Sequence, residues 1–276
     1  MDKRTLKSKI FAVLCFAMIV LSLIPLVSIM VTIGKAGLPH LNLSLFTQNT
    51  PPPGVTGGGL LNAFSGSFII CLIAMAIAIP IGSMVGAFLV MYKHLKITPV
   101  IRLLNDILLS MPSILFGLFV YLLLVKTTGH FSALAGGIAL SMIALPVVAR
   151  GVEDLMLTLP PQIKEAGFGL GAQENQVLYL LMCSIKKGFI GTLMLAFARI
   201  FGETAPLLFT ALSNQFFSIN PLAPMANLPV TLYNFAMSPD SNWQSLAFAG
   251  AFTMMVFVLV LSIVARSLTQ KKGKDE

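Results

Sequence analysis

The chain has 276 residues and a net charge of +8, and 57% of its residues are hydrophobic whereas only 10% are charged. Soluble domains usually carry about 25% charged residues, so this composition excludes a soluble enzyme or a soluble binding module. The segment 60–91 contains no Asp, Glu, Lys, Arg or His, and a helix that spans a membrane needs roughly 20 such residues. The sequence therefore predicts an all-α membrane protein.

Apolar segments long enough to span a membrane occur six times. The first follows a basic stretch with Lys3, Arg4, Lys7 and Lys9, and it continues to Val31 without a cleavage site of small residues. We therefore expect a retained first helix rather than a signal peptide. Hydropathy places the six expected transmembrane helices at 9–33, 64–92, 103–126, 133–149, 188–212 and 246–267.

The distribution of Lys and Arg predicts how these helices are oriented. Of 18 basic residues, 15 lie at the two chain ends or in the segments 93–102 and 150–187. The opposite side has only Lys35 and Lys126, and Arg199 falls within a span. Because cytoplasmic segments of membrane proteins are enriched in Lys and Arg, we expect both termini in the cytoplasm.

The same topology divides the chain into three parts. Residues 1–63 are expected to form the first transmembrane helix and a periplasmic loop, 64–267 the transmembrane domain, and 268–276 a basic cytoplasmic tail. The longest cytoplasmic loop of that domain, 150–187, is polar, yet its part from 163 to 181 has the composition of a helix. It either presents a helix to a cytoplasmic partner or simply connects two spans.

A motif in this loop favours a helix that is presented to a cytoplasmic partner. Glu165, Ala166 and Gly171 fit the E-A-A-x-x-x-G signature of the permease subunits of ABC importers, with Gly167 in place of the second alanine. The I-x-L-P ending of that signature is missing at 181–184. The resemblance implies the type I, MetI-like permease fold and a helix at about 162–172 that couples the permease to a cytoplasmic ATPase.

Three further segments resemble one branch of that family, the PstA-type permeases of phosphate importers. The run 198–207 matches A-R-x-x-G-E-T-A-P-L, 110–118 matches S-x-P-S-I-x-x-G-L, and 145–150 matches L-P-x-x-x-R. The proline-rich segment 51–54 favours the PstA type over the related PstC type. The resemblance implies phosphate import across the bacterial cytoplasmic membrane, with a PstC-type second permease, a dimer of ATP-binding cassette ATPases, an external phosphate-binding protein and the surrounding lipid as partners.

Two charged residues fall at the fifth expected span. Arg199 and Glu203 stand four residues apart, so on a continuous helix they share one face. Each costs about 2.5–3.5 kcal/mol at the centre of a bilayer on insertion scales, so the pair is expected to be bonded, hydrated or functional. It is either a structural ion pair, or Arg199 binds phosphate in bidentate geometry while Glu203 positions it and Thr204 donates a hydrogen bond.

The third expected span contains Pro112, which must kink that helix or remove a backbone hydrogen bond. Ser110 and Ser113 flank the proline and are able to bond the backbone groups that a kink frees. The segment is either a kink needed for packing or a second element of the substrate pathway.

The sequence contains no G-x-x-x-x-G-K-[ST] phosphate loop, no zinc-like spacing and no nucleophile–base arrangement. We therefore expect this chain to have no catalytic residue, no metal, no bound cofactor and no nucleic-acid partner, and we expect a separate ATPase to use the ATP. Three alternatives remain: a permease for another oxyanion such as molybdate, sulfate or phosphonate, an ion-coupled secondary transporter, and a membrane scaffold for phosphate signalling.

Overall fold

The computed structural model describes residues 3–270 as a chain of helices, with no strand in that range. The remainder of the expected basic tail, 271–276, lies outside the described residues. In chain order the elements are α1 (Lys3–Gly37), the 3₁₀ turn η1 (Leu38–His40), α2 (Ser44–Thr47), α3 (Leu61–Met91), α4 (Thr98–Ser110), α5 (Ser113–Val120), the π-helical turn η2 (Tyr121–Val125), α6 (Lys126–Thr128), α7 (Ala133–Leu157), α8 (Pro161–Gly169), α9 (Glu174–Ser184), α10 (Lys186–Phe201), α11 (Ala205–Thr210), α12 (Leu228–Ala236) and α13 (Ser241–Gln270).

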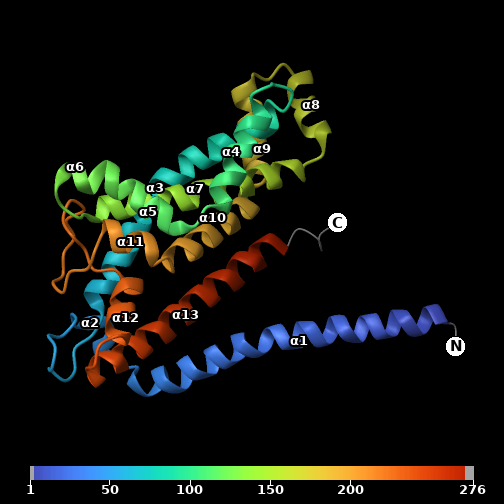
Figure 1. Cartoon of the computed structure of the whole chain (residues 1–276). Helices are drawn as coiled ribbons and strands as arrows, with labels where there is room; N and C mark the ends of the chain where they lie inside the picture. Colours follow the sequence, from blue (N-terminus) through green and yellow to red (C-terminus); the bar gives the residue numbers. More distant parts are fainter. Residues whose placement is uncertain (1–2, 271–276) are drawn as a thin grey trace.

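Four helices are long and apolar enough to cross a membrane, and they lie in α1, α3, α7 and α13. Two further candidates are bent pairs: α4 with the α5–α6 segment, bent by 99°, and α9 with α10, bent by 72°. Counting each pair as one span gives six, the number expected from hydropathy. Figure 1 shows both described chain ends and the α8–α9 hairpin toward one end of the molecule, opposite the loops around α2 and α12.

The centre of the fold is the packing of α3 on α7, which depends on small residues. A Cβ atom added at Gly82 would lie 2.9 Å from the Leu145 carbonyl oxygen, and one at Gly86 would lie 2.4 Å from the Ala149 carbonyl oxygen. These two glycines stand one helical turn apart, so they form a smooth strip against which the α7 backbone lies. Close approach of this kind is how membrane helices associate, because lipid supplies no hydrophobic drive between them.

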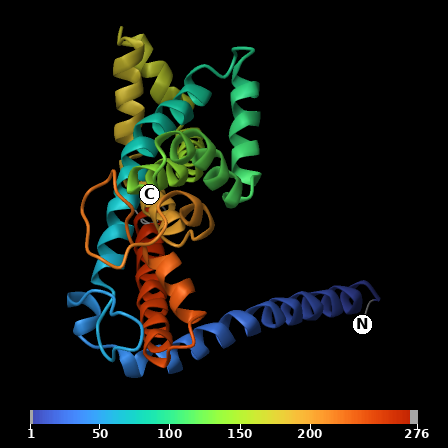
Figure 2. The same cartoon turned by 60° about the vertical axis from the view of Figure 1, so that its left-hand side comes forward.

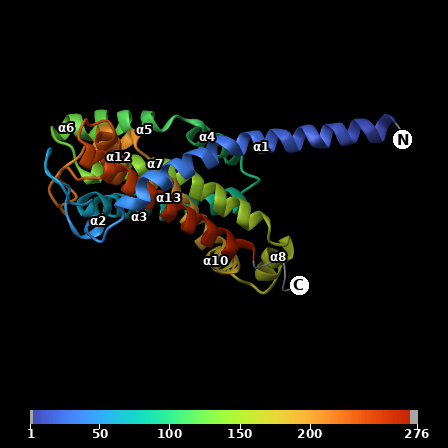
Figure 3. The same ribbon diagram turned by 90° about the horizontal axis from the view of Figure 1, so that it is seen from below.

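Helix α1 packs on the other described helices through its C-terminal part. Gly37 lies against the Phe248 backbone of α13, where an added Cβ would be 2.5 Å from the Phe248 oxygen. Figures 2 and 3 show the N-terminal half of α1 extending away from all other helices. Its apolar side chains, such as Phe11 and Phe16, are exposed, so this half depends on lipid or another chain for burial.

The expected end of the fourth span at residue 149 is wrong, because α7 continues to Leu157. Two features suggested an earlier end: Pro146 and the charged residues that follow it. The proline lies inside the helix and is buried. The charges do not end the helix because Arg150 forms ion pairs with both Glu153 and Asp154, and Arg150 and Glu153 each also pair with a residue of α4.

Two other expected spans are interrupted. The third is not a kinked helix, because α4 ends at Ser110 and α5 begins at Ser113, with Pro112 at the position that precedes α5. The fifth, expected at 188–212, starts at Lys186 and ends at Phe201. Pro206 is the second residue of the next helix, α11, and it has no N–H to continue α10.

The helix expected at about 162–172 corresponds to α8, which ends three residues earlier, at Gly169. The continuous helix expected from 163 to 181 is wrong. Over 163–181 the chain instead forms two helices, α8 and α9, separated by a turn at 170–173. The turn forms because Gly171 has φ +79°, a backbone conformation that cannot continue an α-helix.

Candidate functional site

Arg199 lies on the side of α10 that this chain leaves uncovered. The opposite side of α10 is held by aromatic packing, in which the Phe201 ring lies 4.9 Å from that of Phe257 on α13 and 5.3 Å from that of Phe68 on α3. Leu195 and Arg199 are exposed one turn apart, on a face away from these contacts. Among the described residues, Arg199 makes no hydrogen bond or ion pair through its side chain.

The expected pairing of Arg199 with Glu203 on one helical face is wrong. Helix α10 ends at Phe201, so Glu203 lies in the connection to α11. Its backbone N–H donates to the Ile200 oxygen at 3.2 Å, which closes the last turn. Glu203 and Thr204 are half-buried in this break, directly before the N-terminus of α11.

The break at Pro112 lies on a neighbouring element. Helix α5 packs on α11 so closely that a Cβ added at Gly117 would lie 2.6 Å from the Pro206 Cα. The helices that follow the two breaks are therefore in direct contact. The hydroxyl of Ser110 donates to the Ile107 oxygen at 2.8 Å, and Ser113 is half-buried at the start of α5. The structure thus brings together the helices that begin at Ser113 and directly after Thr204, and within the described residues neither serine forms a hydrogen bond with Arg199.

The structure of the α8–α9 hairpin explains why the E-A-A-x-x-x-G signature ends in glycine. The Gly171 N–H donates to the Phe168 oxygen at 2.9 Å, and the Ala172 N–H donates to the Gly167 oxygen at 3.1 Å. These two bonds, with Gly171 at φ +79°, form a Schellman cap on α8. The final glycine of the E-A-A-x-x-x-G signature therefore ends the first helix and reverses the chain.

Gly167, which departs from the signature, lies where the two helices of the hairpin touch. It is buried, and an added Cβ would lie 3.1 Å from the Val177 side chain. Glu165 and Ala166 are on the exposed side of α8. At the tip, Leu170 is 89% exposed, so the hairpin presents an uncovered apolar side chain as well as an exposed carboxylate.

Two polar contacts fasten this hairpin to the end of α3. The Lys164 ammonium donates to the Met91 oxygen at 3.2 Å, in the last turn of α3. The Tyr92 hydroxyl donates to Glu174 Oε2 at 2.6 Å, and this hydrogen bond to the carboxylate raises the pKa of the tyrosine. One contact holds α8 and the other holds α9, so both helices of the hairpin are tied to the same end of α3.

A charge network joins α4 to the last turns of α7. The Arg102 guanidinium donates to Glu153 Oε1 through Nη2 at 2.6 Å and through Nε at 2.8 Å. The Glu153 side chain is only 3% exposed. Arg150 lies between Asp106, Glu153 and Asp154, at 3.7, 3.7 and 3.4 Å. Asp106 is thus paired with Arg150, and the network fixes α4 against α7 next to the α8–α9 hairpin.

A model of the family described as "Binding-protein-dependent transport system inner membrane component" matches residues 78–274. The chain belongs to this family. The matched range covers α3 from Ala78 to its end and all of the elements that form the two helix breaks, the hairpin and the charge network.

Curated relatives place the permease within one branch of the family. The "Phosphate transport system permease protein PstA" of Yersinia pestis is 43% identical over 271 residues, which are 98% of this chain and 92% of the relative. The protein of the same name from Xylella fastidiosa (strain 9a5c) is 48% identical over 240 residues, 86% of this chain and 83% of the relative. The resemblance to PstA-type permeases noted from the sequence is therefore confirmed.

A solved structure confirms the expected fold. A chain from inward-facing conformations of the MetNI methionine ABC transporter superposes with a TM-score of 0.58, over 76% of this chain and 94% of that chain. The two sequences are 16% identical, so this likeness concerns the MetI-like fold alone.

Sequence reasoning missed the buried partner of the charge network. Glu153 was not singled out, although it follows Arg150 by three residues and so lies on the same helical face. The contacts of Lys164 and Glu174 with the end of α3 had no signal in the sequence, since they join residues 73 and 82 positions apart.

Proposed function

We propose that this permease is one of two membrane subunits of an ATP-driven importer of inorganic phosphate in the bacterial cytoplasmic membrane. The observation that carries the proposal is near-full-length similarity to relatives whose names state phosphate transport. The partners are a PstC-type permease, a dimer of ATP-binding cassette ATPases that hydrolyses the ATP, and an external phosphate-binding protein. Both termini and the hairpin face the cytoplasm, in agreement with the basic residues concentrated there.

In this proposal the transmembrane domain at 64–267 alternates between outward and inward access, while residues 1–63 add the first helix and the outer loop, and the tail at 268–276 stays in the cytoplasm. The ATPase dimer closes on ATP, and the α8–α9 hairpin transmits that movement. Glu165, Ala166, Gly167 and Gly171 form the coupling element. Its exposed Leu170 and Glu165 support docking on a partner, and its two bonds to the end of α3 supply a connection to the membrane helices.

Replacing Gly171 by alanine should weaken coupling. The substitution meets no atom within 4 Å, so its cost comes only from φ +79°, which is about 1–2 kcal/mol for a residue with a Cβ. We expect phosphate-binding-protein-stimulated ATPase activity to fall by about five- to thirtyfold, with normal membrane insertion. Gly169→Ala is the matched control, because its added Cβ also meets no atom within 4 Å, and its backbone is helical. Equal activity of the two variants would count against the hairpin as the coupling element.

We further propose that Arg199 lies on the phosphate pathway, with Glu203 and Thr204 at the adjoining helix break and with Ser110, Pro112 and Ser113 at the second break. The exposure of Arg199 supports this, because a guanidinium on the uncovered side of a membrane helix needs a solvated or charged environment. A second permease subunit on this face would enclose such a space. Guanidinium also matches the geometry of two phosphate oxygens.

Arg199→Lys should reduce phosphate uptake strongly while leaving assembly intact. Lysine keeps the charge but loses the bidentate geometry. The loss of a charge-assisted hydrogen bond, about 1.5–3 kcal/mol, corresponds to about a ten- to hundredfold lower rate of uptake. The measurement is uptake of labelled phosphate by the assembled complex. Leu195→Met, one turn away on the same exposed face, is the control. Wild-type uptake by Arg199→Lys would exclude bidentate binding.

A further inference from the structure

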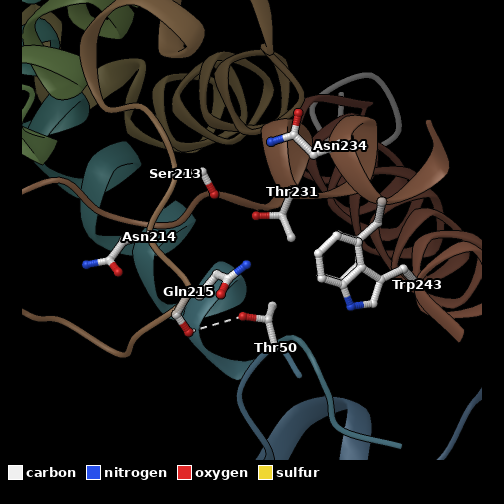
Figure 4. A pocket seen from close by; sticks show the side chains of 8 residues that line it. Thr50, Ser213, Asn214, Gln215, Thr231, Asn234 and Trp243 are labelled. Carbon is white, nitrogen blue, oxygen red and sulfur yellow. Dashed lines mark hydrogen bonds between the residues drawn. The ribbon is translucent and has the colours of Figure 1, made fainter. Parts of the chain in front are cut away.

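A cavity of about 230 Å³ lies among the loops at the end of the molecule opposite the α8–α9 hairpin. Its walls come from the first long loop, the segment that follows α11, helix α12 and the start of α13 (Figure 4). We call it the outer pocket, and its lining residues are Thr50, Ser213, Asn214, Gln215, Thr231, Asn234, Phe235 and Trp243.

Buried hydrogen bonds between distant segments hold the pocket walls in place. Asn62 on α3 donates to Thr50 Oγ1 at 3.0 Å and to the Gln215 oxygen at 3.0 Å. Thr50 Oγ1 itself donates to the Gln215 oxygen at 3.1 Å. On the other side, the Trp243 Nε1 donates to the Pro51 oxygen at 3.1 Å. The pocket is therefore formed before anything binds, which lowers the entropy cost of binding.

One buried hydroxyl in the pocket has no partner. Thr231 is 3% exposed, and its Oγ1 makes no hydrogen bond within the described chain. Thr210, an equally buried threonine of α11, donates to the Pro206 oxygen one turn earlier in its helix at 2.8 Å. In Figure 4 the Thr231 hydroxyl instead points into the space between Ser213 and Gln215. An unpaired buried hydroxyl is costly, so this group is poised to bond an occupant of the pocket.

The other free polar groups around Thr231 are neutral. Among the described residues, the side chains of Ser213, Gln215 and Asn234 have no hydrogen-bond partner, whereas the Asn214 carboxamide is already bonded to the Pro224 oxygen and the Phe216 N–H. Hydroxyls and carboxamides each both donate and accept. The pocket thus offers donors and acceptors together, which suits a neutral polar group.

The absence of basic residues around the outer pocket disfavours an anion as its occupant. No Lys or Arg occurs in the segments 38–60 and 211–245 that surround the pocket, and their one carboxylate is Asp240. That carboxylate accepts backbone N–H bonds from Gly54 at 2.7 Å and from Asn242 at 2.8 Å, and such bonds, chiefly the one from Gly54, lower its pKa. A phosphate dianion in the outer pocket would therefore have no cation to compensate its loss of hydration.

We propose that the outer pocket receives a neutral hydrogen-bonding side chain of the external binding protein, and that Thr231 is the buried anchor of this contact. The proposal rests on the proposed function, because that function places a binding protein on this face of the permease. Tyr233 on α12 and Met237, which directly follows that helix, are exposed. Tyr and Met are enriched at protein interfaces, and here they extend the contact surface around the pocket.

The test is a comparison of docking affinities on the complete complex in lipid nanodiscs, with the purified binding protein as the probe. Thr231→Val keeps the shape of the side chain and removes the unpaired hydroxyl. We expect about three- to tenfold weaker docking, the effect of one hydrogen bond, with unchanged or higher thermal stability of the complex. Asn234→Trp, at an exposed position, fills the pocket and should abolish docking. Thr47→Val on α2, an exposed threonine outside the pocket, is the control and should dock as the wild type does.

Each of these measurements either supports or overturns the docking proposal. Because no charged residue lines the pocket, the ratio of wild-type to Thr231→Val docking affinity should be the same at low and high ionic strength. Wild-type docking by both pocket variants would overturn the proposal. It would also be overturned if Thr231→Val lowered the binding of labelled inorganic phosphate in the absence of the binding protein, since the pocket would then be a substrate site. Failure of the wild-type complex to transport phosphate would refute the proposed function instead, because the docking comparison is made between variants whatever the cargo.

Discussion

Arg102→Met should unfold much of the permease, because it leaves the Glu153 carboxylate buried without its closest partner. Removing one member of a buried ion pair costs about 3–5 kcal/mol. We expect the lower end of that range, since the Arg102 side chain is 40% exposed and Arg150 remains 3.7 Å from Glu153. The measurement is the thermal unfolding of the purified complex, together with the yield of folded permease.

The double variant Arg102→Met/Glu153→Leu separates a missing charge partner from a loss of packing. Replacing both ions by apolar residues of similar size is often close to neutral, so the double variant should recover most of the stability that the single variant loses. If the double variant is less stable than Arg102→Met alone, the ion pair does not account for the loss.

Gly86→Leu should prevent α3 from packing on α7. Even a methyl group at this position would lie 2.4 Å from the Ala149 carbonyl oxygen and 2.8 Å from the Val152 Cβ. The backbone of α7 cannot move aside as a flexible side chain would, so we expect a loss of at least about 1–3 kcal/mol, typical of an overpacked core, and poor recovery of folded protein. Resistance to unfolding by a denaturing detergent measures this effect.

Ala76→Leu is the control for Gly86→Leu, because Ala76 is exposed on the same helix. A leucine there adds apolar surface without entering the contact between α3 and α7. If both variants resist denaturation equally, the close packing of α3 on α7 is not needed for the fold.

Composition and hydropathy predict the class of this fold well, and they fail where polar residues continue a helix. The apolar segment of α3 is expected within three residues of its observed ends, Leu61 and Met91. The extension of α7 to Leu157 escapes hydropathy, because Arg150 and Glu153 look like loop residues until the partner Arg102 on α4 is known. Such long-range pairing has no local signature.

The sequence predicted the candidate site only where a motif residue sets the local backbone conformation. Gly171 is marked by the signature and proves to be a helix cap with φ +79°. The expected shared face of Arg199 and Glu203 was wrong because spacing alone assumes a continuous helix, and Pro206 helps to end α10 before Glu203. Thr231 had no sequence signal, since its hydroxyl is unusual only for lacking the bond that Thr210 makes.

The decisive measurement is accumulation of labelled phosphate in proteoliposomes that contain the complete complex, with ATP on the ATPase side and the binding protein on the other. We expect uptake that needs ATP and this permease together and that excess sulfate or molybdate does not inhibit. Uptake driven by an ion gradient without ATP, or transport of another oxyanion in preference to phosphate, would contradict the assignment of this chain as the permease of a phosphate importer.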